Sequence, residues 1–514
     1  MGRVRLPWWV PLSALVLVLA LLGLAPLASR ASAPTLEVEP EPPPSAPAQP
    51  VLAPLAPADA APIDAQRLRE RLDPLIADPA LGVSGVLVAD SATGESLLSR
   101  GSTLALIPAS GQKIASSAAA LAAWGPHHRL ATSTQLRGDE VVLVGGGDPT
   151  LTTATKVDPS IYPPQSRLQT LVDRTAKALA SRGVDDVDLS YDTTLFSGPA
   201  LSPDWGRDLV SLGVIAPVSA LGFAADAPDI PTPGPDTNRA DVVAQWFAQR
   251  LRATGITVGE VDEATEAVVE DGSDSSDGAT VDDAQSPPAQ VELARLTSAP
   301  LSAIVTSALT DSDNDVAEAL FRLAAVGEGL PGTFEGGSQA VRDRLRSWGI
   351  STAGITVTDG SGLARSNRIT PAALAGLVTQ VSVMGAQTPT SEGSGSAGDG
   401  SADDALVGVG DSQLRPDDVE GSWLVPALAV AGYTGTLSER FTGLATRDAA
   451  GRVTAKTGTL TGVTNLSGLV STQQGRLVSF SVIANDVTDS IAAREVVDRI
   501  AAAIASCGCA ADSG

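Results

Sequence analysis

The stretch Pro108-Ala109-Ser110-Gly111-Gln112-Lys113-Ile114 places a hydroxyl and an amine three residues apart. Residues three apart on a helix share one face, so we expect the Ser110 oxygen and the Lys113 nitrogen to meet. Pro108 suits a helix start, and the small apolar residues at 114–123 predict a helix packed in the core of the fold. Because a serine becomes a good nucleophile only when a base takes its proton, the pair is a candidate for covalent catalysis.

Lysine is scarce in this chain. Only four of its 34 basic residues are lysines, and they are Lys113, Lys156, Lys177 and Lys456. A buried lysine can lose its proton and act as a base, whereas an arginine stays protonated. A Ser-x-x-Lys match arises readily by chance in 514 residues, so its meaning depends on the rest of the chain.

The composition excludes several classes of function. The formal net charge of −25 argues against nucleic acid as a partner, and no basic patch offsets it. The two histidines are adjacent, at His127 and His128, which argues against a histidine-based triad or a multi-histidine metal site. Cys507 and Cys509 are too few for a structural zinc site, and they form either a small disulfide or a pair between chains. No metal and no other cofactor is predicted.

The N-terminus has the pattern of an export segment. Two arginines precede an apolar run at 6–27, so residues 1–33 are predicted to be a signal peptide or a membrane anchor. Pro34 would hinder cleavage just before it, and both forms stay open. Residues 34–62 are rich in Pro and Ala, which predicts an extended linker. In either form the body of the protein is expected to be extracytoplasmic.

The remaining chain fits one α+β domain that is split in sequence into residues 63–133 and 296–514. The first part has a helical pattern, a hairpin over 85–99 and the Ser110 helix. The second part begins with helical patterns and ends with a strand, a hairpin over 464–485 and an amphipathic helix. The two parts are therefore expected to form one α+β domain, an antiparallel sheet with helices.

An insertion separates these parts. Residues 134–295 alternate strand and helix patterns, which predicts an accessory α/β region with its own fold. Its triple glycine, 145–147, lacks a following Lys-Ser/Thr and is interpreted as a tight turn, not a phosphate loop. Residues 266–290 are predicted to be mobile, and 387–421 to be a disordered acidic insertion.

Two further motifs carry candidate site residues. Ser312-Asp313-Asn314 lies between two helix patterns, where Ser and Asp are also ordinary N-caps, and Lys456-Thr457-Gly458 lies on a predicted strand. Together with Ser110-x-x-Lys113 they occur in the order of the penicillin-recognising serine enzymes, which include the β-lactamases, and the chain resembles this group. Two of the four lysines fall on these motifs.

The resemblance extends to one family within this group. Residues 65–509 resemble the low-molecular-mass class C penicillin-binding proteins, which are D-alanyl-D-alanine carboxypeptidase/endopeptidases. The stretches that carry it are Leu143–Leu151, Ala216–Ala220, Ser312–Glu318, Asp359–Leu363, Gly432–Leu437 and Ala455–Val463. The gap of about 200 residues between the first two motifs fits this family, whose extra domains are inserted there. The resemblance implies a penicillin-recognising serine transpeptidase/β-lactamase-like fold.

The resemblance also implies roles for the helical residues. Ser110 would attack the carbonyl of a D-Ala-D-Ala bond and form an acyl-enzyme, with Lys113 as the base. Ser312 would pass a proton to the leaving amine. Asn314 would hold the Lys113 side chain or the substrate amide.

The strand residues are implied to bind substrate. Lys456 would act as a fixed positive charge that favours the neutral form of Lys113, and it would hold the terminal carboxylate of the substrate. The hydroxyls of Thr457 and Thr459 would meet the same carboxylate, and Gly458 would leave room for the substrate backbone. The backbone N–H groups of the nucleophile and of Thr459 would form the oxyanion hole.

Gly111 departs from the family, which more often has a side chain next to the nucleophile, so the sequence predicts a looser turn there. No catalytic group is missing, so we predict an active serine-type D-Ala-D-Ala carboxypeptidase that acts on peptidoglycan stem peptides or cross-links and is acylated by β-lactam antibiotics. Two alternatives are a β-lactamase, for which no Glu-containing deacylation motif stands out, and a non-catalytic peptidoglycan-binding envelope protein. The intact motifs argue against the second.

Overall fold

The computed structural model describes residues 60–158, 160–206, 208–224, 234, 236–264, 290–384 and 424–509. Outside these residues lie the predicted signal or anchor at 1–33 and the predicted disordered insertion at 387–421. So do most of the predicted linker, as far as residue 59, and most of the predicted mobile segment, as far as residue 289. No helix within the described ranges is long and apolar enough to span a bilayer.

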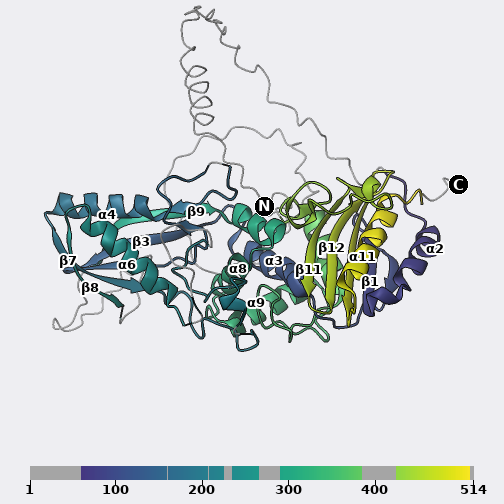
Figure 1. The fold of residues 1–514 in the computed structure, drawn as a ribbon, viewed down its shortest axis with the longest axis horizontal. Coiled ribbons are helices and arrows are strands. Elements are labelled where there is room, and N and C mark those ends of the chain that lie inside the picture. Colours follow the sequence, from purple (N-terminus) through teal and green to yellow (C-terminus); the bar gives the residue numbers. More distant parts are fainter. Residues whose placement is uncertain are drawn as a thin grey trace, which may run out of the picture. The chain divides into compact units, whose positions relative to one another are not determined.

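A six-stranded antiparallel sheet forms the first of two large sheets, with strand order β10-β11-β12-β13-β1-β2. Figure 1 labels its strands β11, β12 and β1. Its strands are β1 (Val83–Asp90), β2 (Ser96–Arg100), β10 (Ala429–Val430), β11 (Val453–Leu460), β12 (Val463–Ser471) and β13 (Leu477–Asn485). β1 pairs with β13 along its whole length, from Val83↔Asn485 to Asp90↔Val478. The two ends of the folded chain therefore close one sheet, and the predicted α+β class with an antiparallel sheet is confirmed.

Helices cover both faces of this sheet, some directly and some as a further layer. They are α2 (Ala65–Ile76), α3 (Gln112–Trp124), α7 (Leu301–Thr306), α8 (Asn314–Gly327), α9 (Phe334–Ser347), α10 (Pro371–Met384) and α11 (Ser490–Ala505), of which α8 and α9 pack against α3. On one face α11 packs against β12 and α2, and on the other α10 packs against β1, β13 and α3. Along β13, Phe480 and Val482 join the core on the α11 side, whereas Ile483 joins the core around α3, α8 and α10. This alternation is the period of two that a strand buried on both faces requires.

The second sheet is mixed, with strand order β8-β7-β4-β3-β9. Its strands are β3 (Arg129–Arg137), β4 (Glu140–Val144), β7 (Asp186–Asp192), β8 (Thr257–Glu263) and β9 (Gln290–Pro300). β4, β7 and β8 are parallel, and α4 (Leu168–Arg182) and α6 (Arg239–Arg252) lie between them in sequence as crossover helices. The inserted region is thus α/β, as its pattern predicts. The predicted limits at 134 and 296 fall inside β3 and β9, so the sheet itself spans residues 129–300.

Short elements complete the described chain. They are β5 (Leu151–Thr152), β6 (Ser166–Arg167), α5 (Asp208–Ser211), a π-helical turn η3 (Ser307–Asp311), and the 3₁₀ turns η1 (Pro79–Leu81), η2 (Ala109–Gly111), η5 (Gly435–Leu437) and η6 (Arg447–Ala449). Of these, η2 and η3 lead directly into the site described below.

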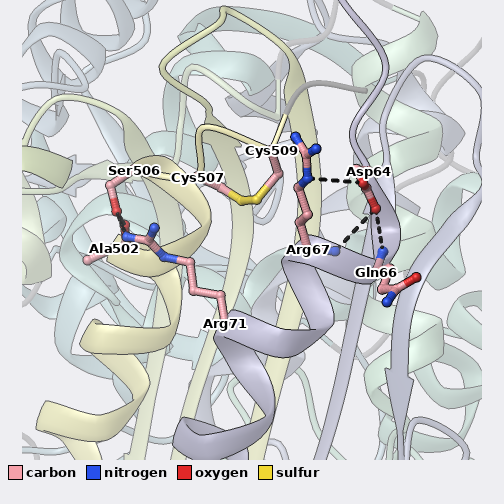
Figure 2. Close-up of a disulfide and its surroundings, with 8 residues drawn as sticks. All are labelled: Asp64, Gln66, Arg67, Arg71, Ala502, Ser506, Cys507 and Cys509. Carbon is pink, nitrogen blue, oxygen red and sulfur yellow. Dashed lines mark hydrogen bonds and ion pairs between the residues drawn. A yellow bond between two sulfur atoms is a disulfide. The ribbon is translucent and has the colours of Figure 1, made fainter. Parts of the chain in front are cut away.

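The C-terminal end is attached to the start of α2. Figure 2 shows that Cys507 and Cys509 form a disulfide, so the cysteines pair within the chain. The Asp64 backbone N–H donates to the Cys509 carbonyl at 2.7 Å, and the Arg71 guanidinium donates to the Ser506 hydroxyl at 2.6 Å (Figure 2 draws both arginine and serine). The disulfide joins residues two apart, so its effect on the unfolded chain is small and its role is local.

Candidate active site

Ser110 lies on the 3₁₀ turn η2, directly before α3 and not within the α-helix itself. The residue before it, Ala109, has φ 48°, a left-handed conformation that is uncommon for alanine and typical of strained functional turns. Both neighbours of Ser110 are buried, whereas Ser110 is half-buried. The turn therefore presents one hydroxyl from an otherwise closed surface.

Lys113 is fully buried, and its amine has three partners. Its Nζ lies 3.0 Å from Ser110 Oγ, 2.7 Å from Asn314 Oδ1 and 2.8 Å from the carbonyl oxygen of Ser361. The amide and peptide oxygens can only accept hydrogen bonds. A neutral amine that donates to both of them keeps its lone pair for its remaining partner, the Ser110 hydroxyl. This geometry suits proton transfer from Ser110 to Lys113.

Asn314, at the start of α8, is oriented by the inserted region. Its Nδ2 donates to the Val214 carbonyl at 2.7 Å, which leaves Oδ1 to face Lys113. Asp313 caps α8 by accepting a hydrogen bond from a first-turn N–H. Ser312 lies just before this cap with φ 66°, and its hydroxyl has no hydrogen-bond partner among the described residues.

The strand side of the site is β11. Lys456 is fully buried, and its Nζ donates to the Thr457 carbonyl at 3.0 Å. The Thr457 hydroxyl donates to the Thr436 hydroxyl at 2.9 Å, whereas Thr459 is exposed. The predicted strand residues thus lie on one strand, with the amine turned inward and Thr459 open to solvent.

Gly458 is where β11 meets the nucleophile turn. A Cβ at this position would lie 2.7 Å from the Pro108 carbonyl oxygen and 3.1 Å from the Gly111 nitrogen. The space that a side chain at 458 would fill is occupied by the turn, and not kept for substrate as the sequence-based argument supposes. Glycine is required here because the strand packs closely on the backbone that carries Ser110.

The sequence predicts a looser turn at Gly111, and this prediction is wrong. A Cβ at Gly111 would lie 2.0 Å from Nδ2 of Asn465, a residue that is 2% exposed. That amide donates to the Pro108 carbonyl at 2.9 Å, and the Ser467 hydroxyl donates to Asn465 Oδ1 at 2.8 Å. The missing side chain makes room for a buried amide that holds the turn.

Burial produces the neutral amine. It lowers the pKa of Lys113 to about 8, while the carboxylates of Asp359, Glu318 and Asp313 act in the opposite direction. The sequence-based prediction assigns this effect to burial together with a positive charge on Lys456, and burial alone accounts for it. The charge on Lys456 is not fixed, because burial lowers the pKa of Lys456 itself well below its usual range and the charge of Lys113 acts in the same direction. The two buried amines therefore compete for positive charge.

Sequence reasoning missed the groups that hold the catalytic lysine and its turn. Ser361 and Val214 act through their backbone carbonyls, so their residue types carry no signal. Asn465 acts through its side chain, and a signal for it existed. It pairs with Gly458 across the β11–β12 hairpin, and that register follows from the turn between the two strands.

A serine hydroxyl in contact with a buried amine, on a turn packed against an antiparallel sheet with helices on both faces, defines a serine enzyme of the acyl-transfer class. The chain belongs to the D-Ala-D-Ala carboxypeptidase 3 (S13) family, whose model matches residues 68–244, 237–401 and 391–506. The predicted family, the class C penicillin-binding proteins, is confirmed. So is the enzyme class, a serine-type D-Ala-D-Ala carboxypeptidase.

Relatives cover nearly the whole chain. Carboxypeptidase DacB of Mycolicibacterium smegmatis is 31% identical over 507 residues, which are 98% of this chain and 97% of that protein. A D-alanyl-D-alanine carboxypeptidase of an Actinomadura species is 31% identical over 512 residues, covering 85% of this chain and 86% of that protein. The crystal structure of penicillin-binding protein 4 from Haemophilus influenzae has a TM-score of 0.60 at 19% identity, covering 85% of this chain and 98% of that one. This last likeness shows a shared fold.

Proposed function

We propose that this chain cleaves the D-Ala-D-Ala bond of peptidoglycan stem peptides, or the corresponding cross-links, through an acyl-enzyme on Ser110. The observation that carries the proposal is the 3.0 Å contact between Lys113 Nζ and Ser110 Oγ, in which the other two Lys113 partners only accept hydrogen bonds. Neutral Lys113 takes the Ser110 proton as Oγ bonds to the carbonyl carbon of the penultimate D-Ala. The bond to the terminal D-Ala nitrogen then breaks.

The leaving amine needs a proton, and we assign its transfer to Lys113 and Ser312. Lys113 holds the proton it took from Ser110. The Ser312 hydroxyl, which has no hydrogen-bond partner among the described residues, relays this proton to the leaving nitrogen. Asn314 keeps the amine in place throughout. Water then attacks the ester on Ser110, which releases the shortened peptide and restores the enzyme.

On the strand side, we assign Lys456, Thr457 and Thr459 to the terminal carboxylate of the substrate. Lys456 donates a single hydrogen bond within the described chain, so its other N–H groups can serve a ligand. A bound carboxylate raises the pKa of a nearby amine, so substrate binding would return Lys456 to its charged form. The backbone N–H groups of Ser110 and Thr459 are assigned to the oxyanion hole.

The domain organisation is part of the proposal. We assign catalysis to residues 63–133 and 296–514, and an accessory role to 134–295. Peptidoglycan lies outside the cytoplasm, so we also assign export to residues 1–33, as a cleaved signal or as an anchor in the membrane.

A fluorescent penicillin tests the function directly. We expect a stable covalent adduct in the wild type and none in Ser110→Ala. Ser117→Ala is the matched control, because Ser117 is a fully buried serine on α3, the helix that follows the Ser110 turn, and its hydroxyl has no partner among the described residues; this variant should be labelled like the wild type. Fast turnover of the penicillin would identify a β-lactamase instead. No labelling of folded wild type would identify a binding protein without activity.

A second assay separates the two peptidase activities. Release of D-Ala from a synthetic peptide that ends in D-Ala-D-Ala measures carboxypeptidase activity, and cleavage of a cross-linked muropeptide dimer measures endopeptidase activity. Both should be lost in Ser110→Ala and kept in Ser117→Ala.

A further inference from the structure

A buried acid lies behind the catalytic lysine, and the mechanism above gives it no role. Glu318, on α8, is fully buried, and it has no ion-pair partner among the described residues. Both of its oxygens accept a hydrogen bond from the Gly360 N–H, at 3.0 and 3.1 Å, and one accepts from the Ser361 N–H at 2.7 Å. Burying a carboxyl group without a cation is costly, so its presence calls for a compensating role.

Glu318 shares a helix face with Asn314, because residues four apart on a helix are neighbours. Asn314 accepts one N–H of Lys113 directly, at 2.7 Å. Glu318 holds the 360–361 backbone, and the Ser361 carbonyl accepts another N–H of Lys113 at 2.8 Å. One face of α8 therefore sets both of the acceptors that direct the amine at Ser110.

A second acid completes the same loop. Asp359 accepts hydrogen bonds from the Gly362 N–H at 2.9 Å and the Ala364 N–H at 2.7 Å. It also accepts the indole N–H of Trp205, from the inserted region, at 2.8 Å. Asp359 thus holds the N–H of Gly362, and Glu318 holds the N–H groups of Gly360 and Ser361. The Ser361 carbonyl lies between these anchored groups.

The acids that position the loop also act on Lys113 through their charge. The groups that face Lys113 are the carboxylates of Asp359, Glu318 and Asp313 and the amine of Lys456, whose charge is in turn offset by Asp311. Burial raises the pKa of Glu318 to about 8, and the charge of Asp359 adds to this. Arg322, one turn along α8, senses the charge of Glu318 but donates its hydrogen bonds to backbone carbonyls and forms no ion pair with it among the described residues. Glu318 and Lys113 therefore titrate in one pH range.

We propose that Glu318 is a positioning residue for the Lys113 amine. Its carboxylate orders Gly360 and Ser361 so that the Ser361 carbonyl holds one Nζ hydrogen, and its negative charge stabilises the ammonium that forms when Lys113 takes the Ser110 proton. Being fully buried, it acts through Lys113 and not on the substrate. The inference rests on the proposed acyl transfer through Ser110.

The test measures acylation by a fluorescent penicillin as a function of pH in the full chain. In Glu318→Gln the amide nitrogen meets a backbone N–H of Gly360 or Ser361, so the Ser361 carbonyl moves. We expect acylation to slow on the order of 10²-fold, with the KM for a D-Ala-D-Ala peptide nearly unchanged. The acid limb of the pH profile should move to lower pH, because loss of a negative charge lowers the pKa of Lys113.

Glu318→Asp separates charge from geometry. It keeps the carboxylate but shortens the side chain by one methylene, so we expect a slower rate with the acid limb in its wild-type position. If Glu318→Gln does not fold, the acylation rate of Glu318→Asp is the test. A wild-type acylation rate in Glu318→Asp would then overturn the proposal.

Asp90→Asn is the matched control for disruption of a buried acid. Asp90 is 3% exposed, accepts backbone N–H groups of Ala92 and Thr93, and pairs with Arg476. This variant should lower the Tm and leave the acid limb unchanged. A folded Glu318→Gln with the wild-type rate and limb, or an equal shift in Asp90→Asn, contradicts the role of Glu318. Failure to label the wild type would instead refute the acyl-enzyme itself.

Discussion

The two buried lysines of the site differ in how many hydrogen-bond partners hold their amines. On the helix side, Lys113 is held by three partners from three separate segments, namely Ser110, Asn314 and Ser361. On the strand side, the one hydrogen bond that Lys456 donates within the described residues goes to the carbonyl of Thr457. Both amines are fully buried. The Lys113 amine is therefore fixed in direction, whereas the Lys456 amine keeps N–H groups that can bind a ligand.

This difference separates their chemistry. A buried donor without a partner costs free energy, so the strand side is incomplete until an acceptor binds there. The helix side is already satisfied and requires only the loss of one proton. Lys113 is thus built for proton transfer, and Lys456 for holding an anion. Substitutions should separate the two roles.

The largest effect is expected for Lys113→Arg. An arginine keeps the positive charge but stays protonated, so it cannot take the Ser110 proton. Acylation by a fluorescent penicillin should slow on the order of 10³-fold. Labelling of this variant at the wild-type rate would remove Lys113 from its role as base.

The pH dependence gives a second measurement on the same residue. Lys113 acts in its neutral form, and its pKa is about 8, so wild-type acylation should rise as the pH increases through this value. The limb should be absent from any residual activity of Lys113→Arg. Its persistence there would assign the limb to another group.

A smaller, substrate-dependent effect is expected for Lys456→Met. A hydrogen bond between charged groups contributes about 1.5–3 kcal/mol, so kcat/KM for a peptide with a free terminal carboxylate should fall roughly 10- to 100-fold. The same peptide with a C-terminal amide lacks the anion and serves as the matched substrate, and the variant should hydrolyse it almost as well as the wild type does. Equal losses on both peptides would show that Lys456 acts in the chemistry and not in binding.

The sequence predicts the elements and motifs of the site better than it predicts the partners of the two lysines. Hydrophobic periodicity and glycine-bounded hairpins are local signals, so the strands, the helices and the three motifs are all predictable. The partners of the two lysines are not local. Ser361 is 248 residues from Lys113, and Val214 is 100 residues from the Asn314 that it orients. Both act through carbonyls that every residue has, so only the tertiary structure reveals them.

The misinterpretation of Gly111 has the same cause. Considered within its own segment, a glycine beside the nucleophile means freedom of the backbone. In the fold, the space beside it is filled by the amide of Asn465, and this amide is hydrogen-bonded to the turn. Gly111 thus does not loosen the turn that carries Ser110. It allows Asn465 of β12 to support that turn.

The smallest effect is expected for Gly111→Ala, which tests this support. The new methyl group would displace the Asn465 amide and break its bond to the Pro108 carbonyl, at a cost of about 1–3 kcal/mol in the free energy of unfolding. Asn465→Ala breaks the same bond and should cost a similar amount. In the double variant the second substitution has little left to break, so the two effects should not add. Urea unfolding measures all three, and strict additivity would show that the glycine and the amide do not depend on each other.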